Sequence, residues 1–464
     1  MQKKLYTRSL FIFRRDLRTT DNNGLNEALK LSEHVIPTFI LDPAQIDRRN
    51  TYRSMNALQC MAESLHDLNQ QLRTHKSQLY LWHGNPTTIV KRLIKEHHIQ
   101  AVFCNRDYTP FSIARDQALH ELCTRDSCAF IQCNDLLLTE PEDILNKSGK
   151  PFAKFTPFFN KARTYIVAAP QPLVHTHFFH QKLANTLSIN AAVELLMPNP
   201  NRLIHTHGGS KEAHKLLRKI SKLTHYAQTR DIPSLPTTHL SAHLKFGTVS
   251  IRRVYHHCIA TVPAHDPLIQ QLYWRDYYTH AIFHHPHMLG HAGNPAYNKL
   301  VWRHTTKLFH VWCSGKTGFP IIDAGMRQLN TTGFMHNRVR MLAAAFLVKD
   351  LRIDWQWGER YFAQKLVDYD PAVNNGNWQW IAATGYCTMP YFRIFNPWTQ
   401  QKKYDPNCIY IKQWVTELRE IEPKKIHLLY RHTVTHYPAP VVNHDQEAKI
   451  TKMWYKARIT ARDK

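Results

Sequence analysis

Short apolar runs alternate with helical patterns over the first 135 residues, and this alternation constrains the fold more than any other feature of the sequence. The runs at residues 9–13, 35–41, 79–82, 101–104 and 129–132 are typical of buried strands, whereas residues 55–72 and 87–97 show helical periodicity. Strands separated by helices indicate βαβ crossovers, and therefore a doubly wound parallel sheet. No G-x-G-x-x-G motif follows the first run, so the sequence lacks the fingerprint of a nicotinamide-dependent dehydrogenase.

A proline-rich stretch follows this α/β region and predicts a long connector, because its residues are weakly periodic. Beyond residue 211 the strand patterns fade, and residues 267–284, 320–330 and 335–349 have helical apolar spacing. The sequence therefore predicts three parts: an α/β domain at 1–135, a linker at 136–210 and a large, almost all-α domain at 211–464.

The chain is strongly basic, with 60 lysines and arginines against 35 acidic residues and a formal net charge of +25. Such a surface attracts polyanions, so nucleic acid is the first partner to expect. The longest apolar run, residues 341–348, is far shorter than the ~18 residues of a membrane-spanning helix, so we expect no membrane protein. Since the apolar run at 10–13 is too short for a secretory signal, we expect a cytoplasmic protein.

Cysteine and histidine are frequent but do not form metal-binding patterns. The nine cysteines include no C-x-x-C pair, so we interpret them as reduced structural thiols. The 31 histidines lack the ordered cysteine or carboxylate companions of a metal site, as the cluster of His284, His285 and His287 illustrates. We therefore expect no bound metal.

Tryptophan is concentrated in the second half of the chain, where ten of the eleven tryptophans follow residue 270. Core packing explains residues such as Trp312 and Trp414. Trp378 and Trp380, however, lie in the stretch 368–380, whose acids and amides a plain apolar core would leave unsatisfied. This density of polar groups indicates a bound polar heterocycle.

Two further patterns are compatible with ligand binding and also with ordinary helices. The hydroxyl-rich residues 237–241 precede a helical run, which suits either a bound phosphate or a helix cap. In residues 335–341, helical spacing puts Asn337 and Met341 on one face with Arg340 at its border. A solvated basic edge is the alternative interpretation of that helix.

Six motifs follow one another along the chain: F-R-R-D-L-R at 13–18, G-K-P-F-A-K-F-T-P-F at 149–158, Y-W-R-D-Y at 273–277, G-K-T-G-F-P-I-I-D at 315–323, M-R-Q-L-N at 326–330 and Y-F-R-I-F-N-P at 391–397. In these motifs, and over nearly its whole length, the chain resembles the DNA photolyases of the photolyase/cryptochrome family. The resemblance is closest to the class I enzymes that act on cyclobutane pyrimidine dimers. It implies an α/β antenna domain joined by a linker to a helical domain that binds FAD and DNA.

The resemblance implies that FAD lies in the helical domain. By the family's pattern, Asp368, Asp370 and Arg340 line the isoalloxazine ring and the ribose, and the Asn374 amide faces flavin N5. An amide suits this place because it accepts a hydrogen bond from a protonated N5 without imposing a charge. The other implied FAD-binding residues are Tyr226, Thr237, Thr238, His239, Leu240, Ser241, Arg275 and Tyr369, among which His239 and Tyr369 replace the family's usual Arg and Gly.

The resemblance also implies a reaction and an electron relay. Photoexcited reduced FAD donates an electron to a cyclobutane pyrimidine dimer, the ring splits and the electron returns; photolyases are among the enzymes that take their target base out of the stack. The implied relay consists of Trp378 beside the flavin, Trp355 in the middle and Trp302 at the surface. Without the family, each of these three would be interpreted as a core aromatic residue.

For the lesion and the DNA, the family's pattern implies walls at Trp274 and Trp380 and a floor at Asn337 and Met341. Gln271 stands where dimer-specific relatives usually carry Glu. The other implied contacts are Arg275 and Tyr278 at the lesion, and Arg230, Arg338, Arg393, Gln400 and Lys403 at phosphates.

Three alternatives follow from these departures. Gln271 is shared with the branch that repairs (6-4) photoproducts, but that branch uses acid/base histidines where this chain has Asn337 and Met341. A cryptochrome-like photoreceptor is the second alternative, against which the lesion-pocket residues argue. The third, a DNA-binding protein that has lost its flavin, is disfavoured by Asn374 and Asp370. We therefore expect ultraviolet-damaged DNA as the partner, a cyclobutane dimer as the lesion and a monomer as the active form.

The antenna chromophore is less defined by sequence. Phe111 and Ser112 stand where folate-binding relatives carry Asn and Glu, so the acid that would hold the pterin is missing. A folate antenna is therefore disfavoured, whereas a deazaflavin, a second flavin or an empty site remains open.

Overall fold

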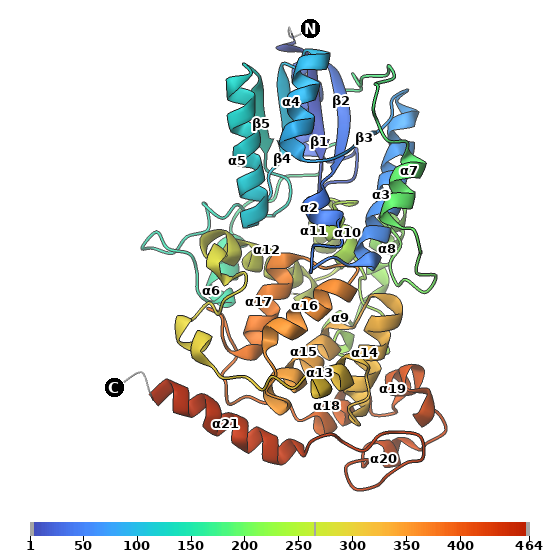
Figure 1. Ribbon diagram of the computed structural model, residues 1–464, viewed down its shortest axis with the longest axis vertical. Helices are drawn as coiled ribbons and strands as arrows, with labels where there is room; N and C mark the ends of the chain where they lie inside the picture. Colours follow the sequence, from blue (N-terminus) through green and yellow to red (C-terminus); the bar gives the residue numbers. More distant parts are fainter. Residues whose placement is uncertain (1–3, 264–265, 461–464) are drawn as a thin grey trace. The chain divides into compact units, whose positions relative to one another are not determined.

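The computed structural model describes residues 4–263 and 266–460, and its chain divides into two compact units. Unit 1 consists of Met1–Arg202, Thr206–Thr224 and Thr238–His284. Unit 2 consists of Leu203–His205, His225–Thr237 and His285–Lys464. The elements of both units are labelled in Figure 1.

A parallel five-stranded sheet forms the centre of unit 1, with the strand order β3-β2-β1-β4-β5. Leu10 of the central strand pairs with Ile36 on one side and Val102 on the other, and all three side chains are buried. This order confirms the predicted doubly wound topology, and each of the five predicted strands is present. The strands are β1 (Tyr6–Phe13), β2 (Ser32–Leu41), β3 (Tyr80–His83), β4 (Ala101–Asn105) and β5 (Ala129–Cys133).

Helices connect these strands and cover the sheet (Figure 1). Leu93 of α4 and Leu119 of α5 belong to one apolar cluster with Leu10 and Val102 of the sheet. The helices of unit 1 are α1 (Asn23–Leu31), α2 (Pro43–Ile46), α3 (Met55–Thr74), α4 (Pro86–His97), α5 (Pro110–Arg125), α6 (Phe155–Ala162), α7 (Ile189–Leu196), α8 (Ser210–Arg218), the 3-10 turn η1 (Ile220–Lys222), α10 (Ser241–Phe246), α11 (Ile251–Thr261) and α12 (Pro267–His284).

The predicted connector at 136–210 contains the helices α6 and α7, and parts of its irregular backbone pack on the sheet. The backbone of Val35 donates to the carbonyl of His177 (2.9 Å) and accepts from the N–H of Phe179 (2.8 Å). Phe179 is 5% exposed and joins the apolar cluster of the sheet. Bulky apolar residues within the proline-rich stretch therefore fix it to the domain that precedes it.

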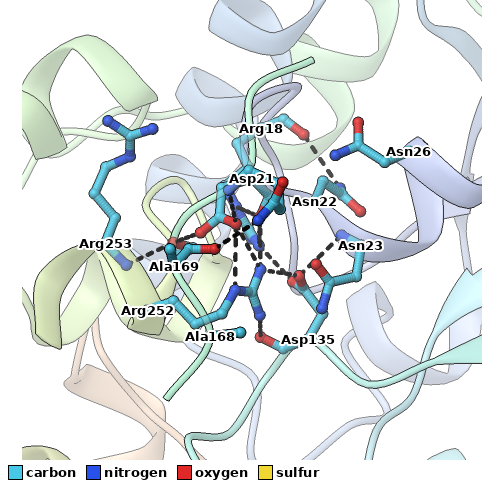
Figure 2. A network of polar contacts seen from close by, with 12 residues as sticks. Arg18, Asp21, Asn22, Asn23, Asn26, Asp135, Ala168, Ala169, Arg252 and Arg253 are labelled. Atoms are coloured by element: carbon cyan, nitrogen blue, oxygen red, sulfur yellow. Dashed lines mark hydrogen bonds and ion pairs between the residues drawn. The ribbon is translucent and has the colours of Figure 1, made fainter. Parts of the chain in front are cut away.

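A buried network of arginines and aspartates ties α11 to the ends of β1 and β5 (Figure 2). Arg252 donates to the carboxylates of Asp21 (3.1 Å) and Asp135 (2.7 Å), and Arg18 donates to Asp135 (2.5 Å). All four side chains are at most 6% exposed. Residues 206–224 and 238–284 are grouped with the sheet in unit 1, and this network is one of the contacts that hold α11 there.

Unit 2 is helical, and its described residues contain no strand. Its core is built on Phe319, Leu329, Val339 and Leu347, which are fully buried. The helices are α9 (Tyr226–Thr229), the 3-10 turns η2 (Pro286–Met288), η3 (Pro295–Lys299) and η5 (Thr416–Leu418), α13 (Thr306–Cys313), α14 (Pro320–Thr332), α15 (Asn337–Ala345), the π-helical turn η4 (Phe346–Asp350), α16 (Trp355–Lys365), α17 (Pro371–Ala382), α18 (Pro397–Tyr404), α19 (Ile409–Trp414), α20 (Pro423–Ile426) and α21 (His444–Thr460). No helix in the described part of either unit has the length and apolar character needed to cross a membrane.

The C-terminal helix α21 is held against η4 by buried polar contacts. The hydroxyl of Thr451 donates to the carbonyl of Lys349 (2.6 Å), and the His444 ring lies 2.5 Å from the carboxylate of Asp350. Burial lowers the pKa of Lys349 to about 7. Burial also raises the pKa of Asp350 to about 6, although the contact with His444 opposes this shift. The last turn of the predicted helix at 335–349 is π-helical, and Lys349 and Asp350 are both buried.

Candidate active site

The predicted site residues are distributed over both units. Unit 1 contains Thr238, His239, Leu240, Ser241, Gln271, Trp274, Arg275 and Tyr278. Unit 2 contains Tyr226, Arg230, Thr237, Trp302, Asn337, Arg338, Arg340, Met341, Trp355, Asp368, Tyr369, Asp370, Asn374, Trp378, Trp380, Arg393, Gln400 and Lys403.

In unit 2, Arg340 and Asp368 form an ion pair with an Nη2 to Oδ2 distance of 2.9 Å. A second hydrogen bond holds the Arg340 side chain in place, because its Nε donates to the carbonyl of Met335 (2.7 Å). The second carboxylate oxygen, Oδ1 of Asp368, is buried and has no hydrogen-bond partner among the described residues. A buried acceptor without a donor is costly, so this oxygen suits an N–H or O–H group of a ligand such as FAD.

Asp370 begins helix α17 and Asn374 lies one turn further along it. The Oδ1 atom of Asp370 accepts from the backbone N–H groups of Ala372 (2.9 Å) and Val373 (3.1 Å), which caps the helix. Asn374 is 9% exposed, and its Nδ2 donates to the carbonyl of Glu359 (3.1 Å). Because the amide nitrogen is engaged, the Oδ1 atom of Asn374 is the group left to accept from a ligand, as the N5 contact requires.

Glu359 is a member of this region that the sequence analysis missed. It is 2% exposed, and its carboxylate lies 3.4 Å from the amide nitrogen of Asn375. The signal in the sequence is an acid placed on the helix that carries Trp355, in a stretch otherwise rich in aromatic residues. Glu359 fixes the orientation of the two neighbouring amides on α17.

The three predicted relay tryptophans all lie in unit 2. Trp378 and Trp355 are 2% and 3% exposed and belong to the main core, and Trp302 is half-buried at its border. Gly358 allows Trp378 to lie directly against α16, because a Cβ at that position would come within 2.2 Å of the indole. Trp302 also contacts Trp454 of α21, with ring centroids 5.0 Å apart.

The predicted lesion floor is a short row on α15. The Nδ2 atom of Asn337 lies 3.8 Å from the sulfur of Met341, which confirms that the two residues share a helix face. The preceding His336 is buried, and its ring Nδ1 accepts from the N–H of Arg338 (3.2 Å), so this histidine caps the helix.

The predicted phosphate contacts of unit 2 differ in their surroundings. Arg338 is in an ion pair with Asp231 (2.7 Å) and lies over the ring of Tyr404 at 4.6 Å. The side chains of Arg393 and Lys403 are exposed. Arg338 is therefore committed to contacts within the protein, whereas these two are accessible to solvent. The remaining implied residues of this unit, Arg230, Thr237, Tyr369, Trp380 and Gln400, are half-buried, and Tyr226 is 7% exposed.

In unit 1, residues 238–241 lead directly into α10. His239 has a left-handed backbone with φ 52°, and the N–H of Leu240 points to the Thr238 hydroxyl (3.5 Å). No side chain caps the first N–H groups of α10, which leaves them available to an anion. Burial and the nearby Lys219 lower the pKa of His239, so this residue favours its neutral form.

Helix α12 carries the other predicted lesion residues of unit 1. The Nε2 atom of Gln271 donates to the carbonyl of Pro267 (3.0 Å) within the same helix, and Arg275 donates to the carbonyl of Leu136 (2.8 Å). Trp274 stacks on Phe155 of α6, with ring centroids 3.7 Å apart and planes inclined by 7°. Tyr278 lies at 5.6 Å from Trp274. One face of the Trp274 ring is therefore already covered by protein.

Two neighbours of the predicted lesion residues were not singled out from the sequence: Phe155 of α6 and Asp276 of α12. Phe155 belongs to the predicted linker, and its signal is the i, i+3, i+4 spacing of Phe155, Phe158 and Phe159. Asp276 is fully buried and accepts from the N–H of Leu138 (2.7 Å). Burial raises the pKa of Asp276 to about 7 although Arg275 opposes the shift.

Within the described parts of the two units, no group of three or more histidine, cysteine or acidic side chains could hold a metal ion. None of the nine cysteines is in a disulfide, and seven of them are buried. Trp312 is fully buried and donates to the carbonyl of Ala343 (3.0 Å), which confirms that it is a core residue.

Comparison with known proteins gives matches in both halves of the chain. Residues 268–457 match a family model described as the FAD binding domain of DNA photolyase, and residues 9–174 match one described as DNA photolyase. The chain is 33% identical to a deoxyribodipyrimidine photo-lyase of Alkalihalophilus pseudofirmus, over 96% of this chain and 97% of the relative.

Solved structures show the same similarity. An archaeal photolyase from Sulfolobus tokodaii, crystallised with two FAD molecules, is 40% identical, with a TM-score of 0.90 and coverage of 97% of this chain and 100% of that chain. A bacterial class III photolyase from Agrobacterium tumefaciens is 31% identical, with a TM-score of 0.90 and coverage of 99% of both chains.

Proposed function

Because this chain belongs to the DNA photolyase family, we propose that it repairs cyclobutane pyrimidine dimers in ultraviolet-damaged DNA by light-driven electron transfer. The curated relatives that it resembles over nearly their whole length are named for this lyase activity. The structural observations that carry the proposal are the Arg340–Asp368 ion pair, whose second carboxylate oxygen is buried without a partner among the described residues, and the buried amide of Asn374. Each of these three groups suits a contact that a flavin needs.

The protein has a FAD-binding domain at residues 268–457, and we assign the ring contacts to Arg340, Asp368 and Asn374. When bound and reduced, FAD supplies, on excitation by light, the electron that splits the cyclobutane ring. The guanidinium of Arg340 stabilises negative charge beside the ring, and the free Oδ1 of Asp368 accepts a ligand hydrogen bond. The Oδ1 atom of Asn374 accepts from N5–H, because its Nδ2 is already bonded to Glu359.

We assign electron transport from the surface to Trp302, Trp355 and Trp378. Their burial supports this order, since Trp302 is half-buried and the other two lie in the core. The packing of Trp378 against Gly358, three residues beyond Trp355 on α16, connects the inner two through one helix.

The lesion assignment rests on the chemistry of α15. Repair of a (6-4) photoproduct requires a proton donor in the pocket, and neither Asn337 nor Met341 has a suitable pKa. His336, which precedes this helix, is buried and uses its Nδ1 as a helix cap. These contacts support a cyclobutane dimer as the substrate.

We further propose that the protein works on DNA in the cytoplasm as a monomer. The net charge of +25 supports binding to a polyanion, and the nine free cysteines are compatible with a reducing compartment.

The decisive experiment illuminates the reduced protein with two oligonucleotides, one carrying a cyclobutane thymine dimer and the other a (6-4) photoproduct. We expect dimer loss with blue or near-ultraviolet light, no loss in the dark and no repair of the (6-4) lesion. Denaturation of the same preparation should release about one FAD per chain. Repair of the (6-4) lesion alone would overturn the lesion assignment, and flavin without any repair would favour a photoreceptor.

A further inference from the structure

A basic segment of unit 1 lies outside all of the DNA contacts considered so far. Residues 146–163 contain five positive side chains and no carboxylate. All five are exposed, and within the described part of the chain none is in an ion pair. The five residues are Lys147, Lys150, Lys154, Lys161 and Arg163. Two acids precede the segment: Glu142 is paired with Arg106, and Asp143 is exposed.

The segment has a fixed shape. Its first part is a turn in which Asn146 accepts side-chain hydrogen bonds from the N–H groups of Ser148 (2.8 Å) and Lys150 (3.1 Å). Gly149 has φ +69°, a left-handed conformation that favours glycine, and a Cβ there would meet no atom within 4 Å. Helix α6 follows at Phe155. The lysines of residues 146–163 therefore lie on a backbone with regular hydrogen bonds.

The inner side of the segment is aromatic and packs on α12. Phe155 stacks on Trp274 at 3.7 Å, and Phe158 contacts Tyr277 edge-on at 5.2 Å. The hydroxyl of Tyr277 donates to the carbonyl of Ala153 (3.0 Å). These contacts fix the backbone that carries Lys154 and Lys161 beside Trp274, which is a predicted lesion residue.

We propose that residues 146–163 form a DNA-backbone surface whose cations contact phosphates next to the base held at Trp274. The proposal rests on the proposed function, because it takes Trp274 as a contact of the lesion. Duplex DNA carries one negative charge per ~1.7 Å of its axis, so a row of exposed cations on ordered backbone matches it without rearrangement. Because none of these lysines is in an ion pair within the described residues, phosphate can replace the water around them; at Lys161 it competes with the ring of Tyr165, whose centroid is 5.3 Å from Nζ.

The test measures the salt dependence of DNA binding by the full-length protein. The double variant Lys154→Gln/Lys161→Gln is compared with the wild type in the dark, using a fluorescent duplex with one thymine dimer and a series of KCl concentrations. Each lost phosphate contact lowers the slope of log Kd against log [KCl] by about 0.9, so the double variant should lose about 1.8. Between 50 and 200 mM KCl the wild type should then lose about 12-fold more affinity than the variant.

A matched control removes the same charge elsewhere in unit 1. Lys91 and Lys95 are exposed on α4, and Lys91→Gln/Lys95→Gln should leave the slope at the wild-type value. Equal slopes for the two double variants would overturn the proposal. This is also the result expected if the basic segment binds an acidic protein instead of DNA. Light-driven dimer repair by the wild type tests the proposed function separately. If the wild type repairs dimers and the two double variants have equal slopes, only the proposed DNA-backbone surface is refuted. If the slopes differ and the wild type does not repair dimers, only the proposed function is refuted.

Discussion

Replacement of Arg252 by methionine tests whether the buried ionic network fixes α11 to the sheet of unit 1. The Arg252 guanidinium donates to the carboxylates of Asp21 and Asp135 and to the carbonyl of Asp21 (2.8 Å). Methionine retains the apolar stem but removes every one of these donors. Figure 2 shows both aspartates beside Arg252 in the wild type. In the variant they remain buried with fewer partners.

The expected loss follows from what the two carboxylates retain. Removal of one member of a buried ion pair usually costs about 3–5 kcal/mol. Here Asp135 keeps Arg18 (2.5 Å), and Asp21 keeps the N–H of Gln171 (2.9 Å) and the Ser250 hydroxyl. We therefore expect the lower end, about 3 kcal/mol. For a unit of this size that corresponds to a fall of roughly 6–12 °C in the melting temperature.

The assay is differential scanning calorimetry of the wild type, Arg252→Met and a control, Arg253→Met. Arg253 is the next residue of α11, and only its backbone N–H takes part, in a bond to the Ser250 hydroxyl. Its replacement changes the net charge equally but should cost no more than about 0.5 kcal/mol. Equal melting temperatures for the two variants would refute the reasoning.

The same network predicts a dependence on pH. Burial alone would raise the pKa of Asp135, but Arg18 and Arg252 lower it below its usual value. A lowered carboxyl pKa contributes stability above the unfolded pKa of about 3.9 and loses it as the pH falls through the folded pKa. In Arg252→Met the pKa of Asp135 should rise, so acid unfolding should begin at a higher pH than in the wild type.

Three further predictions concern the site. Trp378→Phe should abolish photoreduction of oxidised FAD by external donors, measured by flavin absorbance, while chemically reduced protein repairs dimers almost normally; unchanged photoreduction would contradict the relay. Protein made in a folate-rich host should contain no methenyltetrahydrofolate, because Phe111 has no polar group and the Ser112 hydroxyl is bonded to Asp107 (2.9 Å); stoichiometric folate on extraction would show that this is wrong. Gln271→Glu should change lesion affinity by on the order of 1 kcal/mol, about fivefold, without a switch of lesion, since Gln271 already bonds within its helix; repair assays on both lesions decide.

The sheet was predictable because its strands are continuous apolar runs. β1 begins three residues before the predicted run, since Tyr6 and Arg8 pair with β2 although the local pattern is polar. The helix predicted at 335–349 was correct in place, but its π-helical end was not predictable. Lys349 and Asp350 of that turn contact α21, which is about 100 residues away in the sequence, so no local pattern marks the turn.

The site was predictable in part. The polar stretch at 368–380 indicated a ligand without any family knowledge, because buried amides and acids need partners. The roles of the individual residues came from the family resemblance, and they remain predictions. The contact between Phe155 and Trp274 joins residues far apart in sequence, and a proline-rich connector gives no local reason to expect it.

Because Gly358 has no side chain, the position of the Trp378 indole depends on the codon for residue 358 as well as on its own codon. A glycine codon mutated at its first or second base encodes an amino acid with a Cβ or a stop signal, and its third base is silent. Every missense change at this codon by a single base therefore adds a Cβ that would lie only 2.2 Å from the indole of Trp378. Genetic screens for loss of photoreduction should thus recover position 358 as well as the tryptophan itself.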